Sequence, residues 1–87
     1  MEHEQTIRSA AEERRRLCVR FRSPEGRVYE REMEPYGIRG GNLVAFSYYR
    51  DEFREVPLAD ILSLTDTGKR FDPRPHARMS GLDSLEG

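Results

Sequence analysis

Arginine side chains are the residues of this sequence with the clearest potential for chemistry. The chain has fifteen basic residues, and Lys69 is the only lysine among them. A planar guanidinium group binds phosphate or carboxylate through two parallel hydrogen bonds, a geometry that lysine does not provide. The candidate anion contacts are Arg20, Arg22, Arg31, Arg39 and Arg54. The alternative is a set of solvated arginines paired with neighbouring glutamates, as is common for runs of charge.

Tyrosines in the middle of the chain add flat surfaces to this set. Tyr36, Tyr48 and Tyr49 follow the first arginines, and Tyr48 is taken as the candidate contact. Arginines together with aromatic faces suit single-stranded nucleic acid, because phosphates pair with guanidinium groups while bases stack. Tyr48 and Tyr49 also end the most apolar segment, so at least one of them is equally expected in the core.

Residues that could support catalysis are few and poorly placed. His3 and His76 lie in predicted tails, where no rigid surroundings would hold them for acid–base work. The glycines of residues 37–41 match no phosphate-binding loop, and a hairpin turn explains them. Cys18 is the only cysteine, so the chain forms no internal disulfide, and a small buried thiol is the expected state. We therefore predict no enzymatic activity, no metal site and no cofactor.

Composition bounds the size and surroundings of the domain. Eighty-seven residues leave room for one core, and 36% of them are charged. No apolar run approaches the roughly 18–20 residues of a membrane span, and the polar start predicts no secretory signal. A net charge of −1 argues against non-specific binding to nucleic acid through bulk charge. A cytoplasmic location is expected.

Hydrophobic patterning predicts one helix followed by short strands. Residues 4–16 read as a helix, with apolar residues at helical spacing and acidic residues before basic ones. Alternation and turn residues predict strands over 17–22, 27–34, 42–49, 53–57 and 61–65, with one helical turn over 58–60. Pro35 is expected to end or bend the second strand. We predict a mostly β fold, a five-stranded SH3-like (Sm-like) barrel with a short N-terminal helix.

Five segments in this order resemble the WYL domain, a bacterial module with an Sm/SH3-like barrel. The segments are the helix with its basic end and the strand Val19–Phe21, the arginine-to-proline stretch Arg31–Ile38, Leu43–Phe46, Arg54–Ile61 and Thr67–Pro73. The resemblance covers about residues 6–75, which divides the chain into a domain over 4–73 and a disordered tail over 74–87. It implies a stand-alone relative of sensor domains that accompany DNA-binding domains and bind nucleic acid or nucleotide-like ligands through basic and aromatic positions.

Departures from the family pattern bear on that ligand site. Gly41 and Asn42 replace the Trp-Tyr of the name motif, and Leu43 is kept. Arg54 survives in the arginine-rich stretch, but Pro57 and Asp60 stand where basic residues are usual. The sequence therefore supports two hypotheses. The first is a regulatory module, in a transcription-regulation context, that binds single-stranded nucleic acid or a nucleotide-type anion. The second is a protein-interaction or homo-oligomerisation barrel that has lost the ligand site.

Overall fold

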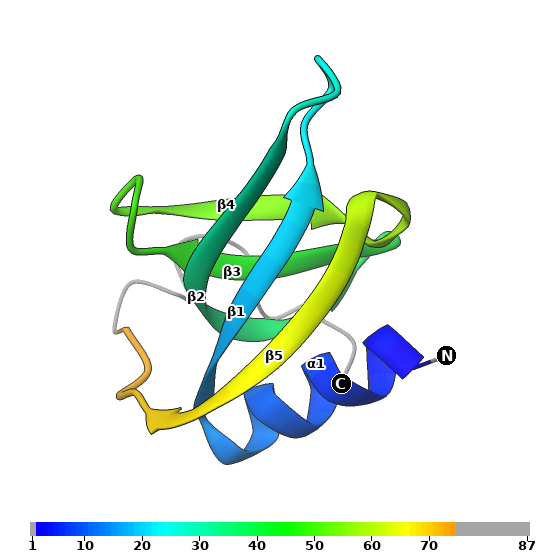
Figure 1. Cartoon of the computed structure of the whole chain (residues 1–87). Helices are drawn as coiled ribbons and strands as arrows, with labels where there is room; N and C mark the ends of the chain where they lie inside the picture. Colours follow the sequence, from blue (N-terminus) through cyan, green and yellow to red (C-terminus); the bar gives the residue numbers. More distant parts are fainter. Residues whose placement is uncertain (1, 75–87) are drawn as a thin grey trace.

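The computed structural model describes residues 2–74 of the chain, as one helix packed on a curled β-sheet (Figure 1). The elements in chain order are α1 (Glu2–Glu13), β1 (Arg15–Arg22), β2 (Val28–Arg39), β3 (Asn42–Ser47), β4 (Glu52–Pro57), the 3-10 helix η1 (Leu58–Asp60) and β5 (Ile61–Arg70). No helix within these residues is long and apolar enough to cross a membrane. The prediction of a mostly β, five-stranded barrel with an N-terminal helix is confirmed.

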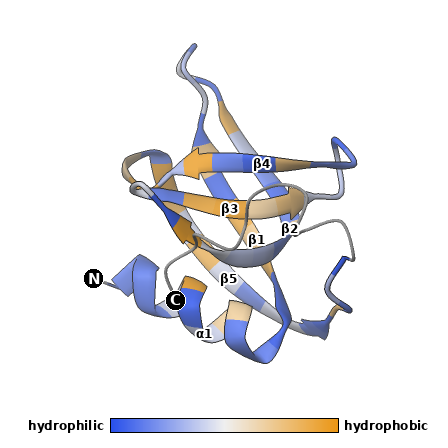
Figure 2. Cartoon of the chain, turned by 180° about the vertical axis from the view of Figure 1, so that it is seen from behind, coloured by the Kyte–Doolittle hydropathy of each residue, from blue (hydrophilic) through white to orange (hydrophobic). Residues whose placement is uncertain are grey.

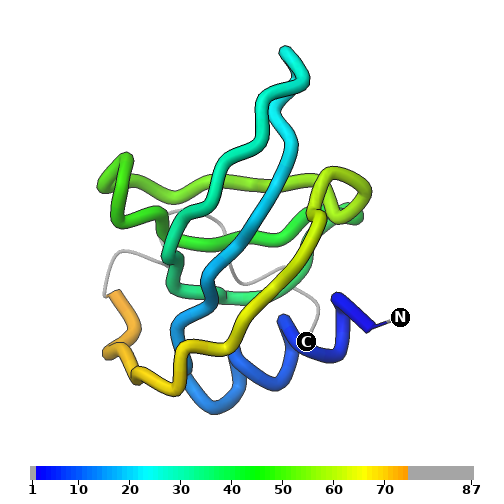
Figure 3. Tube along the Cα trace, viewed as in Figure 1, coloured from blue at the N-terminus to red at the C-terminus, as the bar shows by residue number. Residues whose placement is uncertain are grey.

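The five strands form one antiparallel sheet in the order β4-β3-β2-β1-β5. Strand β2 is the longest, and its first part pairs with β1 while its second part pairs with β3. The register with β3 shifts between Pro35 and Gly37, a bulge that bends the strand because one residue is left unpaired. β3 and β4 consequently run across the direction of β1 and β5 (Figures 1 and 3). The bend expected at Pro35 is thus present, although β2 continues through it.

The core fills the inside of this curled sheet and is capped by α1. Leu17, Val19 and Phe21 alternate inward from β1, as expected from the sequence, and Ile7 of the helix is fully buried beside them. β3 is hydrophobic along most of its length (Figure 2). Burying one such aliphatic side chain stabilises the fold by about 1.5–3 kcal/mol. The core therefore holds the strands in place, while the strand ends and turns carry the polar groups.

Several boundaries differ from the predicted ones. The helix α1 begins at Glu2 and so includes His3, which was predicted to lie in a tail, and β2 continues to Arg39. The helix ends at Glu13 because Arg14 has a φ of 56°, the left-handed conformation that often follows a helix. The last strand continues to Arg70, well beyond Thr65, because it stays paired with β1 as far as Arg15. The predicted tail begins at Arg74, which the structure describes. Residues 75–87 of that prediction lie outside the described part of the chain.

Candidate ligand pocket

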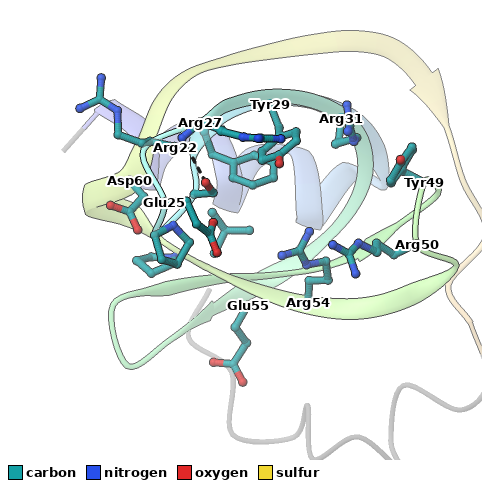
Figure 4. Close-up of a pocket in the computed structure, with 15 residues that line it drawn as sticks. Arg22, Glu25, Arg27, Tyr29, Arg31, Tyr49, Arg50, Arg54, Glu55 and Asp60 are labelled. Atoms are coloured by element: carbon teal, nitrogen blue, oxygen red, sulfur yellow. Dashed lines mark hydrogen bonds between the residues drawn. The ribbon is translucent and has the colours of Figure 1, made fainter.

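A pocket of about 660 Å³ lies at one end of the barrel. Its walls come from the β1–β2 hairpin, the β3–β4 turn, β4 and η1, as Figure 4 shows. The β1–β2 hairpin projects beyond the rest of the barrel (Figure 3) and supplies one wall. This volume falls within the roughly 300–1,000 Å³ of pockets that hold small molecules. We call it the arginine pocket, for the five arginines described next.

Two tight turns place side chains at the rim of the arginine pocket. In the β1–β2 turn, Ser23 accepts hydrogen bonds from Gly26 and Arg27, and Gly26 has a φ of 86° that suits glycine. In the β3–β4 turn, the backbone N–H of Asp51 donates to the carbonyl of Ser47 over 2.8 Å. That second turn leaves Tyr49 at its tip, with its side chain 70% exposed.

Five arginines line this pocket without a carboxylate partner. They are Arg22, Arg27, Arg31, Arg50 and Arg54. Among residues 2–74, none of the ion pairs of the structure includes any of them. Some arginines outside the pocket differ, because Arg15, Arg16 and Arg74 each pair with an acidic side chain. Like charges gathered without counter-charges repel one another and favour binding of an anion.

Aromatic rings lie beside these guanidinium groups. Arg31 is placed between two tyrosines, with its guanidinium carbon 5.0 Å from the ring centre of Tyr29 and 4.0 Å from that of Tyr49. Phe21 and Tyr29 have ring centres 5.9 Å apart, and the Arg54 guanidinium lies 5.7 Å from the Phe21 ring. The Arg31 guanidinium donates one hydrogen bond to the backbone carbonyl of Glu30 at 3.0 Å, and the cation–π contacts orient it while leaving its other N–H donors available. The pocket therefore combines oriented donors with flat surfaces.

Acidic residues also line the arginine pocket, but on a different side. Glu55 points away from the pocket in Figure 4 and binds Arg39 at 2.8 Å and Asn42 at 3.3 Å. The hydrogen bond from Arg39 and, to a smaller extent, the one from Asn42 hold the pKa of Glu55 below its usual value. Glu25 and Asp60 lie on the side of the pocket opposite Tyr49 (Figure 4).

The candidate residues from the sequence fall into four places. The arginine pocket brings Arg22, Arg31 and Arg54 together. Arg20 is exposed on β1, where its neighbours in register are Glu30 and Ser63, and it does not line the pocket. Arg39 pairs with Glu55 at the far end of β2. Tyr48 lies in a separate polar cluster.

That second cluster is built around a buried carboxylate, and we call it the Glu34 cluster. Glu34 is only 4% exposed, and it accepts hydrogen bonds from the hydroxyls of Tyr36 at 2.9 Å and Tyr48 at 2.6 Å. Arg74 donates to both Glu34 oxygens at 2.9 and 3.2 Å, and its guanidinium lies 3.5 Å from the ring centre of Phe46. Every polar group in this cluster has a partner, so its role is to fix the segment after β5 onto the sheet.

Burial also changes the acidity of the two tyrosines in the Glu34 cluster. Desolvation raises the pKa of Tyr36 to about 12, with a further contribution from the Glu34 carboxylate. The same two causes raise the pKa of Tyr48 above its ordinary value. Both hydroxyls therefore stay protonated and act as hydrogen-bond donors at neutral pH.

Two arginines and two tyrosines of the arginine pocket were not selected from the sequence as site residues. They are Arg27 and Tyr29 from the β1–β2 hairpin, and Tyr49 and Arg50 from the β3–β4 turn. Each follows or sits within a turn signal, Ser-Pro-Glu-Gly in the first case and Arg-Asp-Glu in the second. Hairpin turns at the same end of a barrel lie close together. Arginines and tyrosines next to the two turns were therefore the sequence signal that could have identified these four residues.

Cys18 is separate from this pocket. It is half-buried on β1, and its thiol lies 3.4 Å from Glu30. Burial, then the hydrogen bond and charge of Glu30, raise the pKa of the thiol above its ordinary value. Within residues 2–74, no three His, Cys, Asp or Glu side chains are grouped so that they could hold a metal ion.

Comparison with known proteins agrees with this architecture. The structure is similar to proteasome accessory factor B/C (PafBC) of Arthrobacter aurescens, with a TM-score of 0.73 and 23% sequence identity. The match covers 87% of this chain and 13% of that chain, so this chain corresponds to a small part of the larger protein. No curated protein matches the sequence. The family model for the WYL domain matches residues 2–65, well over half of the sequence, and the chain therefore belongs to the WYL domain family.

Proposed function

We propose that this domain is a regulatory ligand sensor whose arginine pocket binds a phosphate-bearing nucleobase ligand, supplied as a nucleotide or as single-stranded nucleic acid. The observation that carries the proposal is the group of five pocket arginines with no carboxylate partner among the described residues. Membership of the WYL family supports a role in transcription regulation, since that is the context that family membership implies. The proposed role is binding and not catalysis.

The chemistry of the arginine pocket suits both parts of such a ligand. Guanidinium forks bind phosphate oxygens through paired hydrogen bonds, and Arg31 is already oriented by the two tyrosines. The exposed ring of Tyr49 and the ring of Tyr29 provide faces on which a base can stack. Phosphate alone would use only the arginines, so the aromatic rings favour a ligand that also carries a planar ring.

Departures from the family pattern fall on the wall of this same pocket. Pro57 and Asp60 line it at positions where the resemblance to the family implies basic residues. The arginines of this pocket come instead from the two hairpins and from Arg54 on β4. We therefore expect the anion to bind at the side of the pocket nearest Tyr49 and not beside η1.

An NMR titration of the ¹⁵N-labelled protein tests this proposal. Short single-stranded DNA, single-stranded RNA, duplex DNA and individual nucleotides are added separately, so that the two sources of the ligand are distinguished. We expect shifts at the amides of Arg31, Tyr49, Arg50 and Arg54 that weaken as salt is added, because ion contacts are screened. A spectrum unchanged by every ligand would overturn the proposal.

A second candidate function is a protein-interaction or homo-oligomerisation barrel. In the described sheet, β5 is paired on one side only, and it carries Leu62, which is 42% exposed. Val28 on β2 is 45% exposed as well. An end strand with exposed apolar side chains can pair with a strand of another protein. Sedimentation over a range of protein concentrations tests the homo-oligomer, and a single monomeric species throughout would exclude it.

A further inference from the structure

Charge is distributed unevenly across the arginine pocket. Figure 4 shows Arg31, Arg50 and Arg54 on the side nearest Tyr49, where no acidic residue faces the pocket. Glu25 and Asp60 lie toward the other side, together with Arg22 and Arg27. One side is therefore purely cationic, whereas the opposite side offers carboxylates as well.

The cationic side is suited to a terminal phosphate. Arg50 comes from the β3–β4 turn, Arg54 from β4 and Arg31 from β2, so three separate segments direct guanidinium groups to one region. A phosphate with several oxygens can accept from more than one of these forks at once. The carboxylates on the opposite side would repel a second phosphate, which favours a single phosphate at the Tyr49 side.

Aromatic rings lie between these two sides. Phe21 is 5% exposed and contacts Tyr29, and both line the pocket. The half-buried ring of Tyr29, with the almost fully buried Phe21 packed against it, forms an apolar surface between the cationic and the acidic side, where the planar base of a nucleotide gains stacking and dispersion. A base held there would direct its polar edge toward Glu25 and Asp60.

The two carboxylates set a requirement on that polar edge. An ionised carboxylate only accepts hydrogen bonds, so its partner on the ligand must be a donor. Glu25 and Asp60 form no ion pair with the arginines of the pocket in residues 2–74, which leaves their oxygens available. Cytosine presents an amino group at its 4-position, where uracil presents a carbonyl oxygen that a carboxylate repels.

We infer that the arginine pocket binds a nucleoside monophosphate in one orientation, with its phosphate at Arg31, Arg50 and Arg54 and the amino group of its base at Glu25 or Asp60. The inference rests on the proposed function and adds the orientation and the class of base. It makes Glu25 and Asp60 specificity-determining residues. Cytidine monophosphate (CMP) therefore binds more tightly than uridine monophosphate (UMP), although the two have nearly the same size and the same charge.

Titration calorimetry with CMP and UMP at one ionic strength tests the inference. A hydrogen bond between a donor and a charged acceptor, partly exposed to water, predicts a CMP affinity about tenfold above that of UMP. The variants are Glu25→Gln, Asp60→Asn and the double variant. Removing a carboxylate also reduces repulsion of the phosphate for both ligands, so the quantity compared is the ratio of the two affinities. Glu12→Gln is the matched control, since Glu12 is exposed on α1 and does not line the pocket.

The outcomes separate this inference from the proposed function. A CMP preference that falls to nearly equal affinities in the double variant, and persists in Glu12→Gln, supports the orientation. Equal binding of CMP and UMP by the unaltered protein overturns the inference and leaves the proposed function standing. A CMP preference that survives in the double variant also overturns it, since another group then reads the base. If neither nucleotide nor any single-stranded nucleic acid binds, the proposed function itself fails.

Discussion

The arginine pocket and the Glu34 cluster contain the same kinds of side chain, but these side chains are paired with one another only in the Glu34 cluster. Both contain arginine, tyrosine and glutamate. In the Glu34 cluster one buried carboxylate accepts from two hydroxyls and one guanidinium, so each charge and each donor is matched within the domain. In the arginine pocket the guanidinium groups contact rings and lack carboxylate partners among residues 2–74. Matched polar groups stabilise a fold, whereas unmatched ones at a surface are available to a ligand.

The comparison has a direct consequence for stability. A buried carboxylate with three charged or polar partners is costly to remove, because the partners are then left unsatisfied. Arg31 and Arg54 are half-buried and contact rings without an ion pair, so each contributes less to stability than the buried carboxylate does. Substitutions in the two regions should therefore separate stability from binding.

The largest expected effect is that of Glu34→Ala. The change leaves Arg74 and two tyrosine hydroxyls without their acceptor, and we expect a loss of about 2–4 kcal/mol in the free energy of unfolding. Urea denaturation followed by far-UV circular dichroism measures it. The matched control is Glu32→Ala on the same strand, whose pair with Arg16 is about one-third exposed on both sides and predicts a loss within about 1 kcal/mol. Equal losses of unfolding free energy in Glu34→Ala and Glu32→Ala would contradict the stabilising role given to the Glu34 cluster.

The second-largest expected effect is the loss of ligand affinity in the Arg54→Gln variant. Loss of one guanidinium from the cationic side of the pocket should weaken CMP binding about tenfold or more, with unfolding free energy changed by about 0.5 kcal/mol or less. Calorimetric titration gives the affinity, and urea denaturation gives the stability. Arg39→Gln is the control, because Arg39 was also a candidate from the sequence but does not line the pocket. An equal loss of affinity in both variants would show that net charge, and not the pocket, attracts the ligand.

Alkaline pH should act on the Glu34 cluster. The pKa of Tyr36 is raised to about 12 and that of Tyr48 is raised as well, relative to about 10 in the unfolded chain. A raised folded-state pKa gives stability that is complete below pH about 10 and is lost as the pH rises toward 12, because the unfolded tyrosines ionise first. Urea denaturation at intervals from pH 8 to 12 measures this decline. The double variant Tyr36→Phe/Tyr48→Phe should show a shallower decline, and an unchanged slope would contradict the assignment.

The order of the elements was predictable because it depends on local patterns. Alternation in Leu17–Phe21 and the turn at Ser23–Gly26 indicate a hairpin without reference to the rest of the chain. The end of α1 was not predictable from the sequence. Nothing in the sequence shows that Arg14, and not one of its neighbours, has the left-handed backbone conformation that ends the helix. The extension of β5 beyond Thr65 depends on pairing with β1, which is a property of the assembled sheet and not of the segment.

The candidate site was less predictable than the fold for a related reason. Strand periodicity shows which arginines point away from the core, but it does not show which of them meet a carboxylate from another strand. Arg39 meets Glu55 across sixteen residues of sequence, and Arg74 meets Glu34 across forty. Tyr48 and Tyr49 are adjacent, yet one binds the buried carboxylate and the other lines the pocket. Only the three-dimensional pairing separates structural from available groups.

The adjacent tyrosines of the β3–β4 turn provide the smallest and most specific test of the comparison. Tyr48→Phe removes one hydrogen bond to Glu34 and should cost about 1 kcal/mol of stability, with CMP affinity unchanged. Tyr49→Leu removes an exposed ring over Arg31 and should leave stability nearly unchanged, while CMP affinity falls several-fold through lost stacking and lost orientation of Arg31. Denaturation gives the stability of each variant and calorimetry gives its CMP affinity. The prediction requires that Tyr48→Phe lose stability but not affinity, and that Tyr49→Leu lose affinity but not stability. Because the two residues share one turn, a general disturbance of that turn would affect both properties in both variants. Such a result would mean that the β3–β4 turn acts as one unit, and the division between a structural cluster and a ligand pocket would then be wrong at this point.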